Sequence, residues 1–138
     1  MSTGKNKFCQ GYHIMVVDDE EKVAKFLTEM LKSKGCTVTT LNNSKTAMDF
    51  FIKNKQSIDL VITDQTMPEM TGAELAQQML SEKPQLPIFL VTGYSEEIDS
   101  DKAAALGIKE YITKPLKLSE LAEKIQKHLP DRLHNQTA

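Results

Sequence analysis

The sequence predicts an α/β domain built on a doubly wound parallel sheet. Three observations carry this prediction: five short apolar runs of strand length, amphipathic segments of helical spacing between and after them, and a length of 138 residues that suits one domain. Strict alternation of strands and helices gives a parallel sheet covered on both faces, and right-handed crossovers restrict its topology. We therefore expect five strands in the order 2-1-3-4-5 and five helices.

The predicted strands are apolar runs of four or five residues, rich in β-branched side chains and bounded by polar or turn residues. They cover residues 13–17, 37–41, 59–63, 87–91 and 110–113. Each run is far shorter than the ~20 apolar residues that a membrane-spanning helix needs, so the sequence predicts no such span.

The predicted helices have apolar residues repeated at spacings of three and four. Gly35 and Pro84 are placed to end the first and third helices, and Ser44 is placed to cap the second. The fourth pattern, over residues 97–106, is the weakest. The fifth, over residues 118–129, is the best defined.

Polar segments flank the predicted domain. We expect residues 1–11 to be a flexible leader, residues 12–130 the domain and residues 131–138 a flexible tail. The leader has lysines but no apolar region after them, so it does not resemble a secretion signal. Two cysteines are too few for a disulfide framework. We therefore expect Cys9 and Cys36 to be reduced thiols in a cytoplasmic protein.

The charge distribution argues against direct binding of nucleic acid. The net charge is −2, from 17 basic and 19 acidic residues, and Arg132 is the only arginine. The chain has no arginine cluster for bidentate contacts with phosphates or bases, so we do not expect it to bind DNA directly. The three histidines stand apart in the sequence and show no zinc-binding spacing: His13, His128 and His134.

Polar residues follow four of the predicted strands, at the point where each strand ends. Asp18 and Asp19 follow the first strand, Asp64 the third, Thr92 the fourth and Lys114 the fifth. Because ligands of such sheets bind outside the carboxyl ends of the strands, we expect these groups around one cleft. For the first two aspartates alone, a role at the start of the following helix is the alternative.

Three carboxylates in one cleft repel one another, by about 1–4 kcal/mol for each pair a few Å apart. A hard divalent cation relieves this repulsion. Mg²⁺ prefers oxygen ligands, keeps several waters and commonly binds one or two carboxylates together with a phosphate. A metal site beside a free carboxylate, a hydroxyl and a lysine suits phosphoryl transfer, where charge on the phosphoryl oxygens must be neutralised.

Four segments together resemble the receiver domain of response regulators in two-component signalling. In the family's order and at its approximate spacings, they are residues 16–20 (VVDDE), 64–72 (DQTMPEMTG), 91–93 (VTG) and 111–116 (YITKPL). The resemblance covers about residues 11–129 and implies a flavodoxin-like fold. The segments 63–68 and 92–96 resemble those of receivers attached to hybrid sensor histidine kinases. The alternative is therefore that this chain is the receiver module of such a larger protein.

The resemblance implies a role for each acidic residue. Asp64 would be the phosphoacceptor. Asp19 would ligate Mg²⁺ directly and Asp18 through water, and the backbone carbonyl of Thr66 would complete the protein ligands together with Asp64.

Further roles implied by the resemblance concern the phosphorylated state. Thr92 would donate a hydrogen bond to a phosphoryl oxygen, and Lys114 would form an ion pair with the phosphoryl group. The peptide bond between Lys114 and Pro115 would be cis. Tyr111 matches the family's switching aromatic residue, with an ordinary edge-strand role as the alternative. Tyr94 would cover the phosphoryl group and slow its hydrolysis, unless its side chain points to solvent.

The resemblance therefore implies a switch and not an enzyme with an external substrate. The phosphoryl group would come from a histidine kinase or a histidine phosphotransfer protein, and activity would be limited to self-phosphorylation and autodephosphorylation. Kinase activity would need a larger chain. Phosphorylation would change the face built by the fourth helix, fifth strand and fifth helix, which can also serve as a homodimer contact.

Three other functions fit the residues less well. A phosphatase of the haloacid-dehalogenase type needs an acid two residues after its nucleophile, where this chain has Thr66. A flavodoxin-like cofactor carrier needs a glycine- and hydroxyl-rich loop after the first strand, where this chain has the acidic residues 18–20. A receiver that has lost phosphorylation is disfavoured because all the key residues are present.

Overall fold

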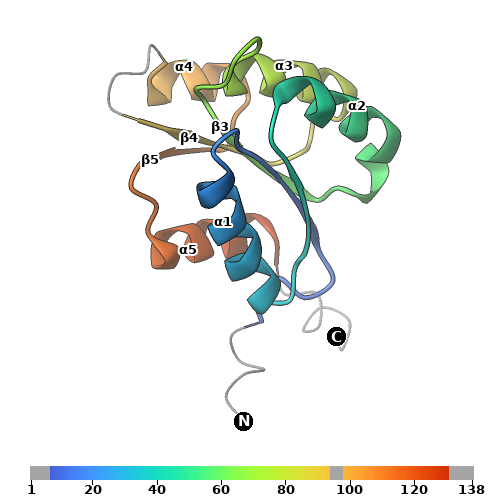
Figure 1. Ribbon diagram of the computed structural model, residues 1–138, viewed down its shortest axis with the longest axis vertical. Helices are drawn as coiled ribbons and strands as arrows, with labels where there is room; N and C mark the ends of the chain where they lie inside the picture. The colour runs from blue at the N-terminus through green and yellow to red at the C-terminus, as the bar shows by residue number, and fades with distance from the viewer. Residues whose placement is uncertain (1–6, 94–97, 131–138) are drawn as a thin grey trace.

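The computed structural model describes residues 7–93 and 98–130 (Figure 1). It contains one parallel sheet of five strands in the order β2-β1-β3-β4-β5, which confirms the predicted topology. The strands are β1 (His13–Val17), β2 (Thr37–Leu41), β3 (Leu60–Asp64), β4 (Ile88–Thr92) and β5 (Glu110–Thr113). Each lies within one residue of its prediction, because apolar β-branched runs flanked by polar residues fix both the type and the limits of a buried strand.

Five α-helices alternate with the strands, as expected. They are α1 (Glu21–Ser33), α2 (Ser44–Asn54), α3 (Gly72–Glu82), α4 (Ser100–Ala105) and α5 (Leu118–His128), and a 3-10 turn, η2 (Lys55–Ser57), follows α2. Helices α1 and α5 cover one face of the sheet, and α2, α3 and α4 cover the other (Figure 1). Helix α4 begins later than predicted, after the N-cap Asp99, and residue 97 lies outside the described residues. None of the helices in the described ranges is both long and apolar enough to cross a bilayer.

The sheet separates two hydrophobic cores. Alternate residues of β1 point to opposite faces: Ile14 and Val16 pack toward α1 and α5, whereas Met15 and Val17 pack toward α2 and α3. All four side chains are fully buried. Because both faces of the central strands are covered, the carboxyl edge of the sheet is the part left open to build a site.

The N-cap of α2 differs from the prediction. Asn43, and not Ser44, has the extended backbone of a cap, and its Oδ1 accepts a hydrogen bond of 2.8 Å from the backbone N–H of Thr46. Ser44 is already the first helical residue, and its buried hydroxyl has no hydrogen-bond partner among the described residues. Both residue types cap helices well, so the sequence alone could not choose between adjacent positions.

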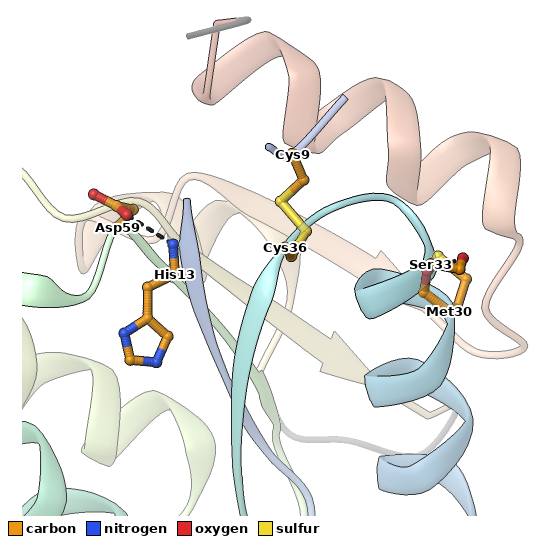
Figure 2. Close-up of a disulfide and its surroundings, with 6 residues drawn as sticks. All are labelled: Cys9, His13, Met30, Ser33, Cys36 and Asp59. Atoms are coloured by element: carbon orange, nitrogen blue, oxygen red, sulfur yellow. Dashed lines mark hydrogen bonds between the residues drawn. A yellow bond between two sulfur atoms is a disulfide. The ribbon is translucent and has the colours of Figure 1, made fainter. Parts of the chain in front are cut away.

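The prediction of two reduced thiols is wrong, because Cys9 and Cys36 form a disulfide (Figure 2). Their Cα atoms lie 4.8 Å apart, and both side chains are buried. The backbone N–H of Cys9 donates to the carbonyl of Lys34, which places the turn before β1 against the turn before β2. Residues 8–11 of the expected leader are therefore part of the packed domain.

Candidate functional site

The carboxyl ends of β1 and β3 bring three carboxylates together. Val17 of β1 is paired with Thr63 of β3, so the residues that follow on each strand are neighbours. Oxygen atoms of Asp18, Asp19 and Asp64 all lie within 4.8 Å of one another. The predicted acidic cluster is therefore present at the predicted edge of the sheet.

Two of these carboxylates are buried. Asp18 is 3% exposed and Asp64 is 4% exposed, whereas Asp19 is exposed to solvent. Burial raises the pKa of Asp18 to about 6; the 2.9 Å hydrogen bond from the backbone N–H of Glu20 opposes the shift, and the charge of Asp64 adds to it. Burial also raises the pKa of Asp64, against the opposing hydrogen bond and charge of Lys114. Burial therefore opposes the negative charge of both carboxylates.

Lys114 supplies a cation to the cluster from the end of β5. Its Nζ lies 2.9 Å from Oδ1 of Asp64 and 3.3 Å from Oε1 of Glu20. Burial alone would lower the pKa of Lys114, but the hydrogen bond and charge of Asp64 and the bond to Glu20 outweigh it and raise the pKa. The peptide bond between Lys114 and Pro115 is cis, as the resemblance implied.

Thr92 ends β4 at the same edge. Its backbone carbonyl accepts a hydrogen bond of 2.8 Å from the N–H of Lys114, which joins the ends of β4 and β5. Its side chain is fully buried, and its hydroxyl has no hydrogen-bond partner within the described part of the chain. Buried polar atoms without partners are uncommon, so this hydroxyl is available to a ligand.

The loop after β3 is shaped by close backbone approach. A Cβ atom added to Gly72 would lie 2.2 Å from the carbonyl oxygen of Asp64, so only glycine fits there. The start of α3 therefore lies directly against the end of β3. Thr66, the residue with the expected carbonyl ligand, lies in this loop with an exposed side chain.

Tyr111 is the residue expected to act as the switch, and Tyr94 is the residue expected to cover the phosphoryl group. Tyr111 is half-buried in β5, packs against the core under α2, α3 and α4, and donates a 2.9 Å hydrogen bond from its hydroxyl to the carbonyl oxygen of Ile98. Tyr94 lies outside the described residues.

Sequence reasoning missed an apolar groove beside the acidic cluster. The groove has a volume of about 500 Å³ and lies between α1 and the segment after β5. Its apolar lining comes from Val23 and Phe26 of α1 and from Pro115 and Leu116. The sequence gives no signal for it, because Phe26 lies at helical spacing from Val23 and Met30 and resembles a core residue, although half of it is exposed.

Comparison with known proteins agrees with this geometry. The family model described as response regulator receiver domain matches residues 14–126. The probable transcriptional regulator ycf27 of Cyanidium caldarium is 33% identical over 115 residues, which are 83% of this chain and 45% of that protein. The regulatory protein AtoC of Escherichia coli is 33% identical over 116 residues, which are 84% of this chain and 25% of that protein. The chain spans less than half the length of both relatives.

Solved structures share the fold. A receiver domain protein from Clostridium thermocellum superimposes with a TM-score of 0.82 at 28% identity, over 86% of this chain and 94% of that one. The response regulator TrrA from Thermotoga maritima, solved in complex with Mg²⁺-BeF, gives a TM-score of 0.77 at 35% identity, over 86% of this chain and 99% of that one. Because the family match covers most of the chain and the strand order agrees with it, the chain belongs to the family of response regulator receiver domains.

Proposed function

We propose that the protein is a phosphoacceptor switch of a two-component system, with Asp64 as the acceptor. In this reaction a carboxylate oxygen of Asp64 forms a bond to phosphorus as the bond to a histidine nitrogen of the donor breaks, and the electron pair stays on the imidazole. The observation that carries the proposal is the buried Asp64 carboxylate with the Lys114 ammonium 2.9 Å away. Chemistry is limited to this group's own phosphorylation and dephosphorylation.

The acidic cluster fits Mg²⁺. Its donors are carboxylate oxygens from three residues, all within 4.8 Å, and hard oxygen donors are what this cation prefers. Asp19 and Asp64 would hold the ion directly and Asp18 through water, with the backbone carbonyl of Thr66 as a further ligand. Bound Mg²⁺ would supply neutralisation of charge on the phosphoryl oxygens. The Mg²⁺-BeF complex of the related TrrA supports this assignment.

Lys114 and Thr92 act on the phosphoryl group. The ammonium of Lys114 already pairs with Asp64, so it is placed to pair with an oxygen of the group that Asp64 accepts. The hydroxyl of Thr92, which has no partner among residues 7–93 and 98–130, can donate to a second oxygen. A preorganised donor of this kind stabilises charge that develops during transfer.

The output is a change of the face built by α4, β5 and α5. Movement of Thr92 toward the phosphoryl group would let Tyr111 leave the carbonyl of Ile98 and turn inward. The same face is our candidate for a homodimer contact. Within a longer hybrid histidine kinase, the chain would be the receiver module.

The phosphodonor is a histidine kinase or a histidine phosphotransfer protein, and we place its docking surface at the apolar groove. The groove contains Phe26 and reaches Lys114, which itself contacts Asp64. A donor protein that covers this groove would therefore bring its phosphohistidine to the acidic cluster and exclude water from the transfer.

The test is mass spectrometry after incubation with Mg²⁺ and acetyl phosphate, a small phosphodonor. We expect one phosphoryl group on the wild type and none on the Asp64→Asn variant. The control is Asp49→Asn, which changes an exposed aspartate of α2 and should be labelled like the wild type. Undiminished labelling of Asp64→Asn would overturn the proposal.

A further inference from the structure

The side chain of Gln65, the residue directly after the acceptor, is buried and hydrogen-bonded through its amide oxygen. It is 7% exposed, and its Oε1 accepts a hydrogen bond of 2.9 Å from the backbone N–H of Ala73 in the first turn of α3. The donor is a backbone N–H, so the oxygen of the amide must face it. A glutamine buried between a strand end and a helix start therefore serves as a fixed acceptor.

The backbone of Gln65 makes two more bonds to the elements around it. Its N–H donates to the carbonyl of Val91 in β4 at 2.9 Å, and its carbonyl accepts from the N–H of Gly72 at 3.0 Å. The first N–H groups of a helix have no partner within the helix. Gln65 thus provides acceptors for two consecutive N–H groups at the start of α3, while Thr71 and Glu74 form a capping box beside it.

These bonds close the loop between β3 and α3 at both ends. The loop contains Glu69 with φ of 72°, a conformation that is uncommon outside glycine, and Thr66 with the proposed carbonyl ligand. A loop with such a residue keeps one conformation only where its surroundings impose it. Gln65 and the capping box are the contacts that fix its ends.

Movement at the start of α3 is transmitted directly to the acceptor. Gly72 packs so closely on the carbonyl oxygen of Asp64 that a Cβ would overlap it, and the hydroxyl of Thr63 donates to the same oxygen at 3.0 Å. A shift of the helix start would therefore move the backbone of Asp64 and the loop that follows it.

We infer that Gln65 is a positioning residue for the phosphorylation site: its amide oxygen holds the start of α3 and thereby fixes the carbonyl of Thr66 and the carboxylate of Asp64 for a shared Mg²⁺. This inference rests on the proposed function. Loss of the Gln65 amide oxygen should loosen the loop and weaken Mg²⁺ binding. The rate of labelling by acetyl phosphate should change little at saturating Mg²⁺.

The experiment compares Gln65→Met, which keeps length but has no acceptor, with Gln65→Glu, which keeps an acceptor oxygen. We expect Mg²⁺ affinity, measured by titration calorimetry, to fall at least about fivefold in the Met variant, as for a lost hydrogen bond, and to be retained in the Glu variant. The rate of labelling by acetyl phosphate should recover in the Met variant when Mg²⁺ is raised. The exposed Gln77→Met of α3 is the matched control and should behave as wild type.

Amide hydrogen exchange gives a readout that needs no metal. The N–H of Ala73 should exchange faster in Gln65→Met than in wild type and Gln65→Glu. If the Met variant does not fold, Gln65→Asn, whose shorter side chain does not reach Ala73, replaces it. Equal Mg²⁺ affinity in the acceptor-free and wild-type proteins, or equal loss in the acceptor-free and Glu variants, overturns the inference. Absence of labelling in the wild type would instead overturn the proposed function.

Discussion

The ammonium of Lys114 lies 2.9 Å from a carboxylate oxygen of Asp64, and this ion pair links the last strand of the sheet to its middle strand. Among the described residues, Lys114 is the cation that forms an ion pair with the buried Asp64. The contact lowers the pKa of Asp64 against the larger effect of burial. Lys114 thus favours the ionised form of Asp64, against the effect of burial.

Replacing Lys114 separates metal binding from phosphoryl transfer. In Lys114→Met we expect labelling by acetyl phosphate to slow by about 10²-fold, the size of effect seen when a preorganised charge-stabilising group is removed. Mg²⁺ affinity should not fall, because the variant removes a competing cation and no oxygen ligand. Stopped-flow labelling and calorimetry measure the two quantities. Lys117→Met, an exposed neighbour, is the control, and a loss of Mg²⁺ affinity in Lys114→Met would contradict this assignment.

The sequence predicted the residues of this cluster because parallel strands bring their carboxyl ends to one edge. Asp18, Asp64, Thr92 and Lys114 each follow an apolar run, and the strand order alone places them together. The role of Gln65 was not predictable in this way. Its partner, the N–H of Ala73, becomes its neighbour only through the shape of the loop between them.

The disulfide was missed for a related reason. Cys9 and Cys36 are 27 residues apart, and neither spacing nor cysteine count indicates that the turn before β1 folds back onto the turn before β2. That contact depends on tertiary structure, including the hydrogen bond between the N–H of Cys9 and the carbonyl of Lys34. The prediction of reduced thiols rests on the cysteine count and the expected compartment, and neither carries information about this contact.

Reducing the disulfide should destabilise the domain. A crosslink that closes a loop of this length restricts the unfolded chain by about 3.5 kcal/mol, so Cys9→Ser with Cys36→Ser should lower the free energy of unfolding by a similar amount. Urea unfolding measures the change. Reductant should destabilise the wild type and leave the double variant unaffected. Two alkylated thiols in the untreated wild-type protein, detected by mass spectrometry, would show that the bond is absent in solution.

The carboxylate of Glu110 gives the domain a pH-dependent element away from the acidic cluster. Burial raises its pKa, but hydrogen bonds from His128, at 2.8 Å, and Lys124, at 3.0 Å, together with the charge of Lys127, outweigh burial and lower it. A carboxyl group with a lowered pKa in the folded state stabilises the fold above its ordinary pKa. This stabilisation is lost as the pH falls through the lowered pKa that Glu110 has in the folded protein.

Glu110→Gln isolates this contribution. We expect the variant to be less stable than wild type by about 1–2 kcal/mol at pH 7, since it loses charge-assisted hydrogen bonds to a largely buried carboxylate. The difference should shrink as the pH falls below the ordinary pKa of glutamate, 4.5, because the wild-type group then also becomes neutral. Urea unfolding of both proteins between pH 7 and acid conditions measures it. A difference that is constant with pH would show that the charge of Glu110 does not contribute.

The exposed ring of Phe26 should matter for transfer from a protein donor and not from a small one. It is 51% exposed and lines the groove that reaches Lys114. Because aromatic side chains at the centre of an interface commonly contribute more than 1 kcal/mol, Phe26→Ala should slow transfer from a phosphorylated histidine phosphotransfer protein by at least about fivefold. Labelling by acetyl phosphate should stay unchanged, since that donor needs no docking surface. Ile52→Ala removes an apolar side chain of similar exposure, 44%, from α2 on the other face of the sheet. It should leave both reactions unchanged, so an equal slowing in the two variants would place the docking surface elsewhere.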